Sequence, residues 1–380
     1  MKSFSNISNK KLKIGINATS ISSRPSGAKI RFLGLYPKLF SSLKKSHFTI
    51  YHSKDYEISM DIKQTDNVSF RKTPFISDKI LARNIRGLFF WKNEIKSQKF
   101  DIFENLNLPT IHNKHGITIQ TIHDVRHLNE NGLLLNFYKF IYKKSSEYSD
   151  AILTVSETMK TEIINKLPDS NVSVIYNGLN FSAPHLRVCS SKRPLKDNYI
   201  LSVGHFEKRK NYINLVLAFH RLVEKGFSDN LVIVGNDSGT KKAVNAIISE
   251  LKLSKRVFLF SNIGSEMLAA LYQHAKLFIF PSKYEGFGIP IIEAFHYRCP
   301  VILSDTSVFR EITEDKLIYF NPNNILKISS AIEKMLTSKD LQLQSINYGI
   351  KRAQDFDNKR LAKMLINEYV GLLSQKNKAE

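Results

Sequence analysis

Two glutamates eight positions apart stand in the part of this 380-residue chain that is richest in groups able to hold a charged ligand. That segment, 280–295, reads FPSKYEGFGIPIIEAF. An apolar strand ends near Ser282, a loop with two glycines follows, and Pro290 stands where a helix begins, a position that tolerates its missing N–H. Free N–H groups at such a helix start, with the positive end of the helix dipole, bind phosphate or diphosphate.

The two glutamates fit a ligand that carries hydroxyl groups as well as phosphates. Glu285 precedes the expected helix and can reach the reacting end of a ligand. Glu293 lies in or just after the first turn and can accept hydrogen bonds from vicinal hydroxyls such as those of a ribose. A simpler interpretation stays open, in which Glu293 only complements the helix dipole and Glu285 is a solvated loop carboxylate.

A basic turn is the second candidate for chemistry. Residues 202–211 read SVGHFEKRKN, in which Gly204 ends a strand and three basic side chains crowd the turn into the next helix. Arg209 and Lys210 can neutralise a diphosphate and stabilise it as a leaving group. An ordinary solvated basic turn has the same composition, so these residues alone do not decide between the two interpretations.

The elements that must position these residues alternate between short β-branched or aromatic runs and longer helical patterns, which predicts βαβ units and parallel sheets. In the first half we expect strands at 12–18, 47–53, 68–74, 100–106, 117–124, 151–156 and 172–177. In the second half we expect them at 199–204, 230–235, 256–260, 277–282, 300–305 and 317–321. Residues 180–198 read as the linker. The expected fold class is α/β, with two Rossmann-like, doubly wound domains that face each other across a cleft.

Composition and charge bound the kind of protein. Hydrophobic residues make up 42% of the chain and charged residues 24%, which argues against disorder and coiled coil. The net charge is +22, and +14 of it falls in residues 1–100, so we expect anionic partners for the first half. Two cysteines, no signal-peptide pattern and no run of ~18 apolar residues predict a cytoplasmic protein, either free or peripheral on the inner face of the cell membrane.

Several segments together resemble the retaining nucleotide-sugar glycosyltransferases of family 4, of the bacterial surface-polysaccharide type. They are VGHFEKRKN, VIYNGLNF, LVIVG and FPSKYEGFGIPIIEAFHYRCPVILSD, joined in the first half by TIHDVRHL and ILTVSETMKTEI. The resemblance implies the GT-B fold, with an N-terminal acceptor-binding domain over 1–182 and a C-terminal nucleotide-sugar-binding domain over 198–354. A C-terminal helix over 355–380 is expected to pack back on the N-terminal domain.

The same resemblance implies roles for individual residues. The implied catalytic residues are Glu285, which contacts the donor sugar hydroxyls, Arg209 and Lys210, which hold the diphosphate, and His123, which faces the donor sugar. The implied donor-binding residues are Glu293 at the ribose, the backbone of Phe287, Gly288 and Ile289 at the phosphates, and Gly27 and Gly204. For His123, a core histidine bonded to a neighbour stays an alternative.

Two positions depart from the family pattern. His205 stands where many members have an arginine, which places more weight on Arg209 and Lys210 for the phosphates. Gly27 stands alone where members tend to carry a pair of glycines.

Gly235 is followed by asparagine rather than a second glycine, and the sequence gives this position no interpretation.

The implied reaction moves a hexose or deoxyhexose from a nucleotide-diphosphate sugar to a hydroxyl of a glycan or lipid-linked glycan acceptor, with retention. GDP-mannose is slightly favoured as donor, and a UDP-sugar-dependent transferase is the alternative. Neither a cofactor nor a metal is expected, and Asp355 and Asp357 are set aside as metal ligands because hard cations need several converging oxygens. A phosphorylase or epimerase on the same fold, and a basic protein that binds nucleic acid or anionic surfaces, are the other candidates.

The segments 78–99 and 137–144 mix cationic and apolar side chains, a pattern suited to an anionic membrane surface but shared by core-facing helices. We therefore predict salt-sensitive binding to anionic liposomes, measured by co-sedimentation at low and high ionic strength. Absence of binding at low ionic strength would remove the membrane interpretation.

Overall fold

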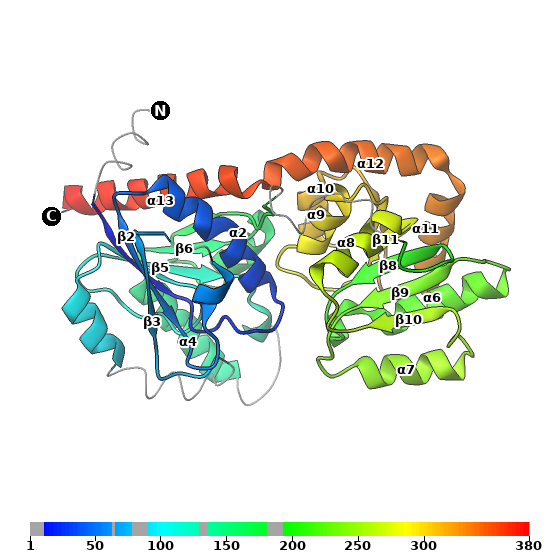
Figure 1. Cartoon of the computed structure of the whole chain (residues 1–380), viewed down its shortest axis with the longest axis horizontal. Helices are drawn as coiled ribbons and strands as arrows, with labels where there is room; N and C mark the ends of the chain where they lie inside the picture. Colours follow the sequence, from blue (N-terminus) through cyan, green and yellow to red (C-terminus); the bar gives the residue numbers. More distant parts are fainter. Residues whose placement is uncertain (1–10, 63–64, 78–89, 129–134, 181–192, 380) are drawn as a thin grey trace. The chain divides into compact units, whose positions relative to one another are not determined.

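The computed structural model describes residues 11–62, 65–77, 90–128, 135–180 and 193–379. Contacts divide the chain into two compact units (Figure 1). Unit 1 comprises Met1–Leu179 together with Asn358–Glu380, and unit 2 comprises Asn180–Asp357. Of the basic segment 78–99, residues 78–89 lie outside the described part of the chain.

Unit 1 is built on a seven-stranded sheet in the order β3-β2-β1-β4-β5-β6-β7, with every neighbouring pair parallel. The strands are β1 (Lys13–Asn17), β2 (His47–His52), β3 (Val68–Lys72), β4 (Ile102–Asn105), β5 (Ile117–Ile122), β6 (Ala151–Thr154) and β7 (Val172–Val174). The helices whose two ends are described are α2 (Gly27–Ser42), α4 (Leu135–Tyr148), α5 (Glu157–Lys166) and α13 (Asn358–Ala379). Residues 90–98 are also helical, and 3₁₀ turns lie at Ile58–Asp61 and Arg126–Leu128. The strand order reverses between β1 and β4, which makes the sheet doubly wound.

Unit 2 is built on a six-stranded sheet in the order β10-β9-β8-β11-β12-β13, again parallel. The strands are β8 (Tyr199–Val203), β9 (Asn230–Val234), β10 (Val257–Phe260), β11 (Leu277–Phe280), β12 (Val301–Ser304) and β13 (Ile318–Phe320). The helices are α6 (Tyr212–Glu224), α7 (Lys241–Glu250), α8 (Ser265–His274), α9 (Ile289–His296), α10 (Ser307–Thr313), α11 (Ile325–Thr337) and α12 (Lys339–Ala353), with 3₁₀ turns at Lys208–Lys210 and Gln354–Phe356.

The sheets confirm the doubly wound α/β fold predicted for each half of the chain. Each of the expected strands is present, although most end one to three residues earlier than predicted. The central strands, such as β5, β9 and β11, are wholly buried, as parallel strands covered by helices on both faces must be. Asp355 and Asp357 were expected inside a late helix. Asp355 instead lies in the 3₁₀ turn Gln354–Phe356 between α12 and α13, and Asp357 directly follows that turn.

A buried carboxylate ties the C-terminal helix α13 to the sheet of unit 1. Glu104 on β4 is fully buried and accepts hydrogen bonds from Tyr36 Oη at 2.6 Å, Thr121 Oγ1 at 3.0 Å and Tyr369 Oη at 2.5 Å. Tyr369 belongs to α13, and its helix buries Leu361, Leu365 and Leu372 in the same core as α2. A buried carboxyl group is tolerated only when its oxygens are hydrogen-bonded in this way.

Part of the pattern assigned to a membrane surface faces a core instead. In the helical residues 90–98, Trp91 and Ile95 are buried and belong to a cluster with Tyr51, Phe75 and Phe103. The core-facing alternative therefore holds for Trp91. Within the described residues, no helix is long and apolar enough to cross a membrane.

Gly235 has a role that the sequence did not reveal, because the backbone after β9 meets the backbone after β8 there. A Cβ added at Gly235 would lie 1.9 Å from the Gly204 carbonyl oxygen. The Gly204 N–H also donates to the Val234 carbonyl at 2.8 Å. Only a residue without a side chain allows the two strand ends to approach so closely.

We predict that Gly235→Ala lowers the melting temperature by about 5 °C or more, because backbone must move to admit the methyl group. Gly371→Ala is the control: Gly371 lies in α13 with nothing within 4 Å of an added Cβ, so its melting temperature should stay level or rise. Equal melting temperatures for the two variants would contradict this account of Gly235.

Candidate active site

The loop between β11 and α9 turns sharply at Gly288. Its φ of +136° is open to glycine but costly for other residues, and an added Cβ would meet Ile291 Cδ1 at 2.9 Å. Pro290 stands in the first turn of α9, where it removes no hydrogen bond. The helix therefore begins as the sequence predicted, and in its first turn the Ile291 N–H donates to the carbonyl of the capping Gly288 at 2.9 Å.

The loop after β8 is joined to this loop by backbone and side-chain contacts. The Lys283 N–H donates to the Arg209 carbonyl at 2.8 Å. Arg209 Nη1 donates to the Tyr284 carbonyl at 3.1 Å. An added Cβ at Gly204 would lie 3.0 Å from Lys210 Cε, so the missing side chain at Gly204 leaves room for the lysine.

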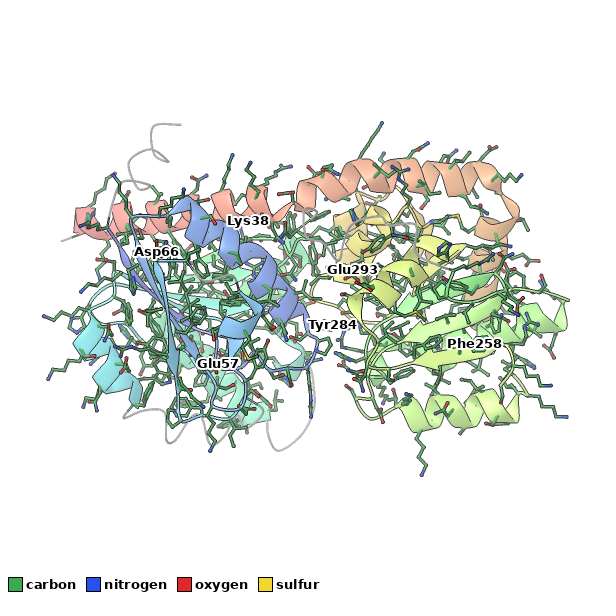
Figure 2. All side chains as sticks on the ribbon, in the orientation of Figure 1. Lys38, Glu57, Asp66, Phe258, Tyr284 and Glu293 are labelled. Atoms are coloured by element: carbon green, nitrogen blue, oxygen red, sulfur yellow. The ribbon has the colours of Figure 1, made fainter. Side chains whose placement is uncertain are left out.

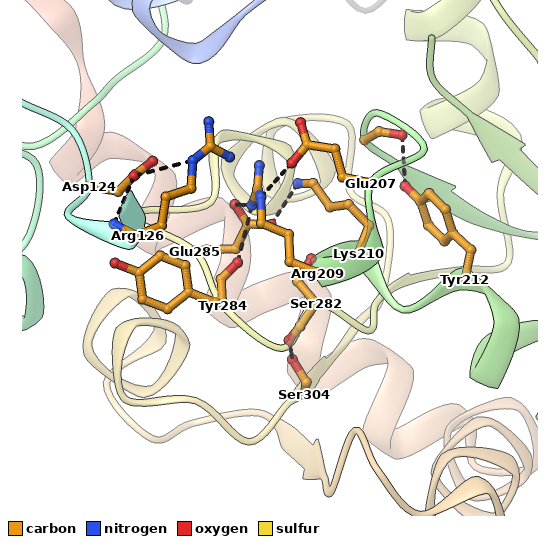
Figure 3. Close-up of polar contacts among 11 residues, drawn as sticks. Asp124, Arg126, Glu207, Arg209, Lys210, Tyr212, Ser282, Tyr284, Glu285 and Ser304 are labelled. Atoms are coloured by element: carbon orange, nitrogen blue, oxygen red, sulfur yellow. Dashed lines mark hydrogen bonds and ion pairs between the residues drawn. The ribbon is translucent and has the colours of Figure 1, made fainter. Parts of the chain in front are cut away.

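Glu285 is the centre of a buried ion cluster in unit 2 (Figure 3). One of its carboxylate oxygens lies 2.6 Å from Lys210 Nζ and the other 2.5 Å from Arg209 Nη1. Arg209 Nε also contacts Glu207 Oε2 at 2.6 Å. Lys210 Nζ lies 4.7 Å from the centre of the Phe280 ring, which adds a cation–π contact. Two cations thus meet two carboxylates.

The cluster shifts the ionisation of its members. Burial would raise the pKa of Glu285, but the charges of Lys210 and Arg209 outweigh it and hold this pKa at about 2. Burial lowers the pKa of Lys210, and the charge of Glu285 opposes that shift. Glu285 is therefore ionised across the physiological range. An anionic ligand that binds Arg209 or Lys210 must compete with a carboxylate already in place.

The pKa of Glu293 shifts in the opposite direction, although Glu293 lies only eight residues after Glu285. It lies on α9 (labelled in Figure 2), and Tyr272 Oη on α8 donates to its Oε2 at 2.9 Å. Burial raises the pKa of Glu293 to about 7, and the hydrogen bond from Tyr272 only partly opposes this. Among the described residues no cation offsets the burial. A ligand whose hydroxyls donate hydrogen bonds to Glu293 would favour the ionised form, and the proton would be released to solvent.

The remaining predicted donor-binding residues of unit 2 lie close to this cluster in the chain. Phe287 is buried and its ring meets Phe356 edge to face, with centroids 5.6 Å apart. Ile289 is buried at the start of α9. Their side chains are therefore used in packing.

His123 and Gly27 lie in unit 1. Burial, with the charge of Arg31, lowers the pKa of His123 to about 3, so the imidazole is neutral. Arg31 is 2% exposed, and its Nη1 donates to the carbonyls of Ile175 at 2.7 Å and Tyr176 at 2.9 Å. Gly27 begins α2 and is exposed, next to the capping Ser26.

The sequence did not identify Glu207, Tyr272 or Arg31, whose side chains contact the predicted site residues or shift their pKa values. Glu207 stood within the quoted basic turn but had no assigned role, and only its contact with Arg209 gives it one. Tyr272 and Arg31 carried no signal, because each lies on a helix whose sequence reads as ordinary packing. Among the described residues no three His, Cys, Asp or Glu side chains gather as a metal site, and Asp355 pairs with Arg352 at 2.9 Å.

Comparison with known proteins matches both halves of the chain to glycosyltransferases. Residues 47–183 match the model described as Glycosyltransferase Family 4, and residues 189–352 match that described as Glycosyl transferases group 1. The two matches together place the chain among the glycosyltransferases, with the family 4 model on its first half and the group 1 model on its second half.

Two relatives, RfbU and WbdA, are similar in sequence. The O-antigen chain mannosyltransferase RfbU of Salmonella typhimurium is 31% identical over 244 residues, which are 63% of this chain and 65% of RfbU. The serotype-specific mannosyltransferase WbdA of Escherichia coli is 34% identical over 172 residues, 44% of this chain and 20% of WbdA. The matched region thus spans just under two thirds of RfbU and a fifth of WbdA.

Solved structures share the fold over almost the whole chain. Sucrose-phosphate synthase from Thermosynechococcus elongatus matches with a TM-score of 0.76 and 17% identity, over 96% of this chain and 100% of that one. Anabaena HepE in complex with UDP and glucose matches with a TM-score of 0.72 and 14% identity, over 95% and 100% of the two chains. These likenesses show that the fold is GT-B.

The raised pKa of Glu293 predicts a pH-dependent stability. A group whose pKa is raised on folding stabilises the fold below its unfolded pKa near 4.5, and that stability is lost as the pH rises through about 7. Glu293→Gln mimics the protonated form. Its melting temperature relative to the parent protein should rise by about 2 °C or more between pH 5 and pH 8, measured without ligand.

Glu285→Gln is the matched comparison, because the pKa of Glu285 is lowered rather than raised. Its stabilising effect is present above pH 4.5 and is lost as the pH falls toward 2, so its destabilisation should be constant from pH 5 to pH 8. A melting-temperature difference for Glu293→Gln that does not change over this range would refute the shift.

Proposed function

We propose that this protein transfers a hexose or deoxyhexose from a nucleotide-diphosphate sugar to a hydroxyl of a glycan or lipid-linked glycan acceptor, with retention at the anomeric carbon. The observation that carries the proposal is the pair Arg209 and Lys210, held by Glu285 in the segment that leads into the N-terminus of α9. Two cations beside the positive end of the α9 dipole form a site for a diphosphate.

The chemistry is a group transfer in which the protein stabilises charge. The bond between the anomeric carbon and the diphosphate oxygen breaks, and its electron pair stays on the diphosphate. The acceptor oxygen forms the new bond on the same face, and its proton passes to the departing phosphate oxygen. Arg209, Lys210 and the α9 N–H groups stabilise the negative charge as it develops, so neither a protein nucleophile nor a metal is needed.

The two glutamates have separate tasks in this proposal. Glu293, with a pKa near 7, accepts hydrogen bonds from the ribose hydroxyls, which favour its ionised form. Glu285 is ionised and accepts hydrogen bonds from the donor sugar hydroxyls once the diphosphate shares its two cations. Neutral His123 is assigned to the donor sugar in line with the family resemblance.

The donor we favour is GDP-mannose. RfbU and WbdA are both named mannosyltransferases, which supports a mannosyl donor and an acceptor in a cell-surface polysaccharide. A UDP-sugar is the alternative. A thermal-shift screen of GDP-, UDP-, dTDP- and ADP-sugars separates them, since the preferred donor should raise the melting temperature most. Release of nucleotide, rather than sugar phosphate, distinguishes a transferase from a phosphorylase.

We predict that Lys210→Met lowers the rate of sugar transfer by about 100-fold or more, because it removes a cation from the leaving diphosphate. Lys208→Met is the matched control. Lys208 lies two residues earlier in the same turn but is exposed, so its loss should change the rate by less than about threefold. Nucleotide release on mixing donor and acceptor measures both.

Folding must be checked first, because Lys210→Met leaves Glu285 with one cation. The melting temperature and the affinity for the nucleotide diphosphate show whether the variant is folded. If Glu293→Ala and folded Lys210→Met both transfer sugar within about a factor of two of the parent rate, the site is assigned wrongly.

A further inference from the structure

A pocket of about 290 Å³ lies in unit 1, beside residues that follow the carboxyl ends of β1 and β4. Helix α4 forms one wall with Phe137, Phe140, Ile141, Lys144 and Tyr148. These positions recur every three or four residues, so they share one face of the helix. The apolar stripe that suggested a membrane surface therefore lines a pocket.

The lining outside α4 includes further apolar side chains. Phe75 and Trp91 are both nearly fully buried, and their rings stack with centroids 6.1 Å apart. Pro109 and Ile111, in the loop after β4, also line the pocket. Because Phe75 and Trp91 are already packed, this part of the lining is preformed, and few side chains need to be ordered when a ligand binds.

Few polar atoms of the pocket are free to meet a ligand. Asn17 Nδ2 donates to Asn105 at 3.3 Å, and Thr110 Oγ1 donates to Gln120 at 2.7 Å. Asn107 Oδ1 and Ser145 Oγ are buried and have no hydrogen-bond partner among the described residues. Buried polar atoms without a partner are uncommon in folded proteins, and a ligand is one way to satisfy them.

The balance of apolar and polar groups decides the kind of ligand. A buried sugar ring would bring several hydroxyls, and each hydroxyl left without a hydrogen-bond partner weakens binding. Among the described residues, the lining offers two buried side-chain atoms without a partner, Asn107 Oδ1 and Ser145 Oγ. An aliphatic chain instead gains from each part of its apolar surface that is buried, and it needs no hydrogen bonds. The lining therefore fits an aliphatic chain.

The charge of α4 indicates what the chain is attached to. The helix carries Lys139, Lys143 and Lys144 against Glu147, which pairs with Lys144 at 2.6 Å. Lys139 and Lys143 are exposed. Phe140 and Tyr148 stand at the rim, 60% and 41% exposed, so apolar and cationic groups adjoin on the surface. Such a rim suits an amphiphile with an anionic head group.

We propose that this pocket binds the aliphatic chain of a lipid-phosphate-linked acceptor, with the phosphate at the lysines of α4. The proposal rests on the proposed glycosyl transfer and names the acceptor class for it. It also gives the basic first half a specific partner in place of a general attraction to anionic surfaces.

Trp91 is the chain's single tryptophan, so its fluorescence reports on this pocket alone. The probe is undecyl phosphate with a bromine at the chain end, used below its micelle concentration, since bromine quenches indole fluorescence on contact. We expect saturable quenching in the full-length protein. Butyl phosphate and inorganic phosphate should neither quench nor compete. Absence of saturable quenching overturns the proposal.

Two exposed positions of α4 give matched variants. Phe140→Asp removes apolar rim and adds a negative charge, and it should raise the Kd of the probe at least tenfold. Asn136→Asp makes the same charge change at an exposed residue outside the pocket lining and should change it by less than threefold. Equal affinities for the two variants overturn the proposal.

Competition assays with the same probe test two other ligands. If methyl α-mannoside displaces the probe, the pocket binds a sugar. If anionic phospholipid vesicles displace it as well as the free lipid phosphate does, the surface binds a membrane. Either result overturns the proposal.

The nucleotide-sugar thermal shift is measured on the same samples, because its residues lie in unit 2. Donor binding without quenching leaves the proposed function intact and removes this site. Quenching without donor binding keeps the lipid site but refutes the glycosyl transfer on which the acceptor role rests. The two failures are therefore distinguishable.

Discussion

The contact of Glu285 with Lys210 and Arg209 is the constraint on which the rest of the site depends. It joins the loop after β8 to the loop that enters α9, and these loops are separated by more than seventy residues of sequence. A buried charge cluster is stable only while all its members are paired, because removing one leaves another uncompensated. Gly204 and Gly235 allow the same arrangement. A side chain at Gly235 would collide with the Gly204 backbone, and a side chain at Gly204 would crowd Lys210.

The same constraint explains why two glutamates of one segment ionise so differently. Glu285 meets two cations and its pKa falls to about 2, whereas Glu293 meets only a tyrosine hydroxyl and its pKa rises to about 7. Without ligand, the cations are matched by carboxylates. A diphosphate therefore gains less from Arg209 and Lys210 than two free cations would give, and the helix N-terminus supplies the remainder.

The sequence predicted the alternation of strands and helices well, because buried parallel strands leave short apolar runs that loops and helices interrupt. It also placed Glu285, Arg209 and Lys210 in one site, through the family resemblance. It did not predict the contacts of Glu207 and Tyr272, which depend on side chains brought together by the fold. Nor did it distinguish a membrane-facing stripe on α4 from one that lines a pocket, because both have the same helical spacing.

Calorimetry of GDP and UDP binding tests the central claim, that this site binds a nucleotide diphosphate with Glu293 at the ribose. Titrations at pH 7 in buffers of different ionisation enthalpy give the number of protons released. We expect one nucleotide to bind with about half a proton more released from the parent protein than from Glu293→Gln, since hydrogen bonds from the ribose complete the ionisation of Glu293. Binding of neither nucleotide, or the same proton release from both proteins, would contradict the account.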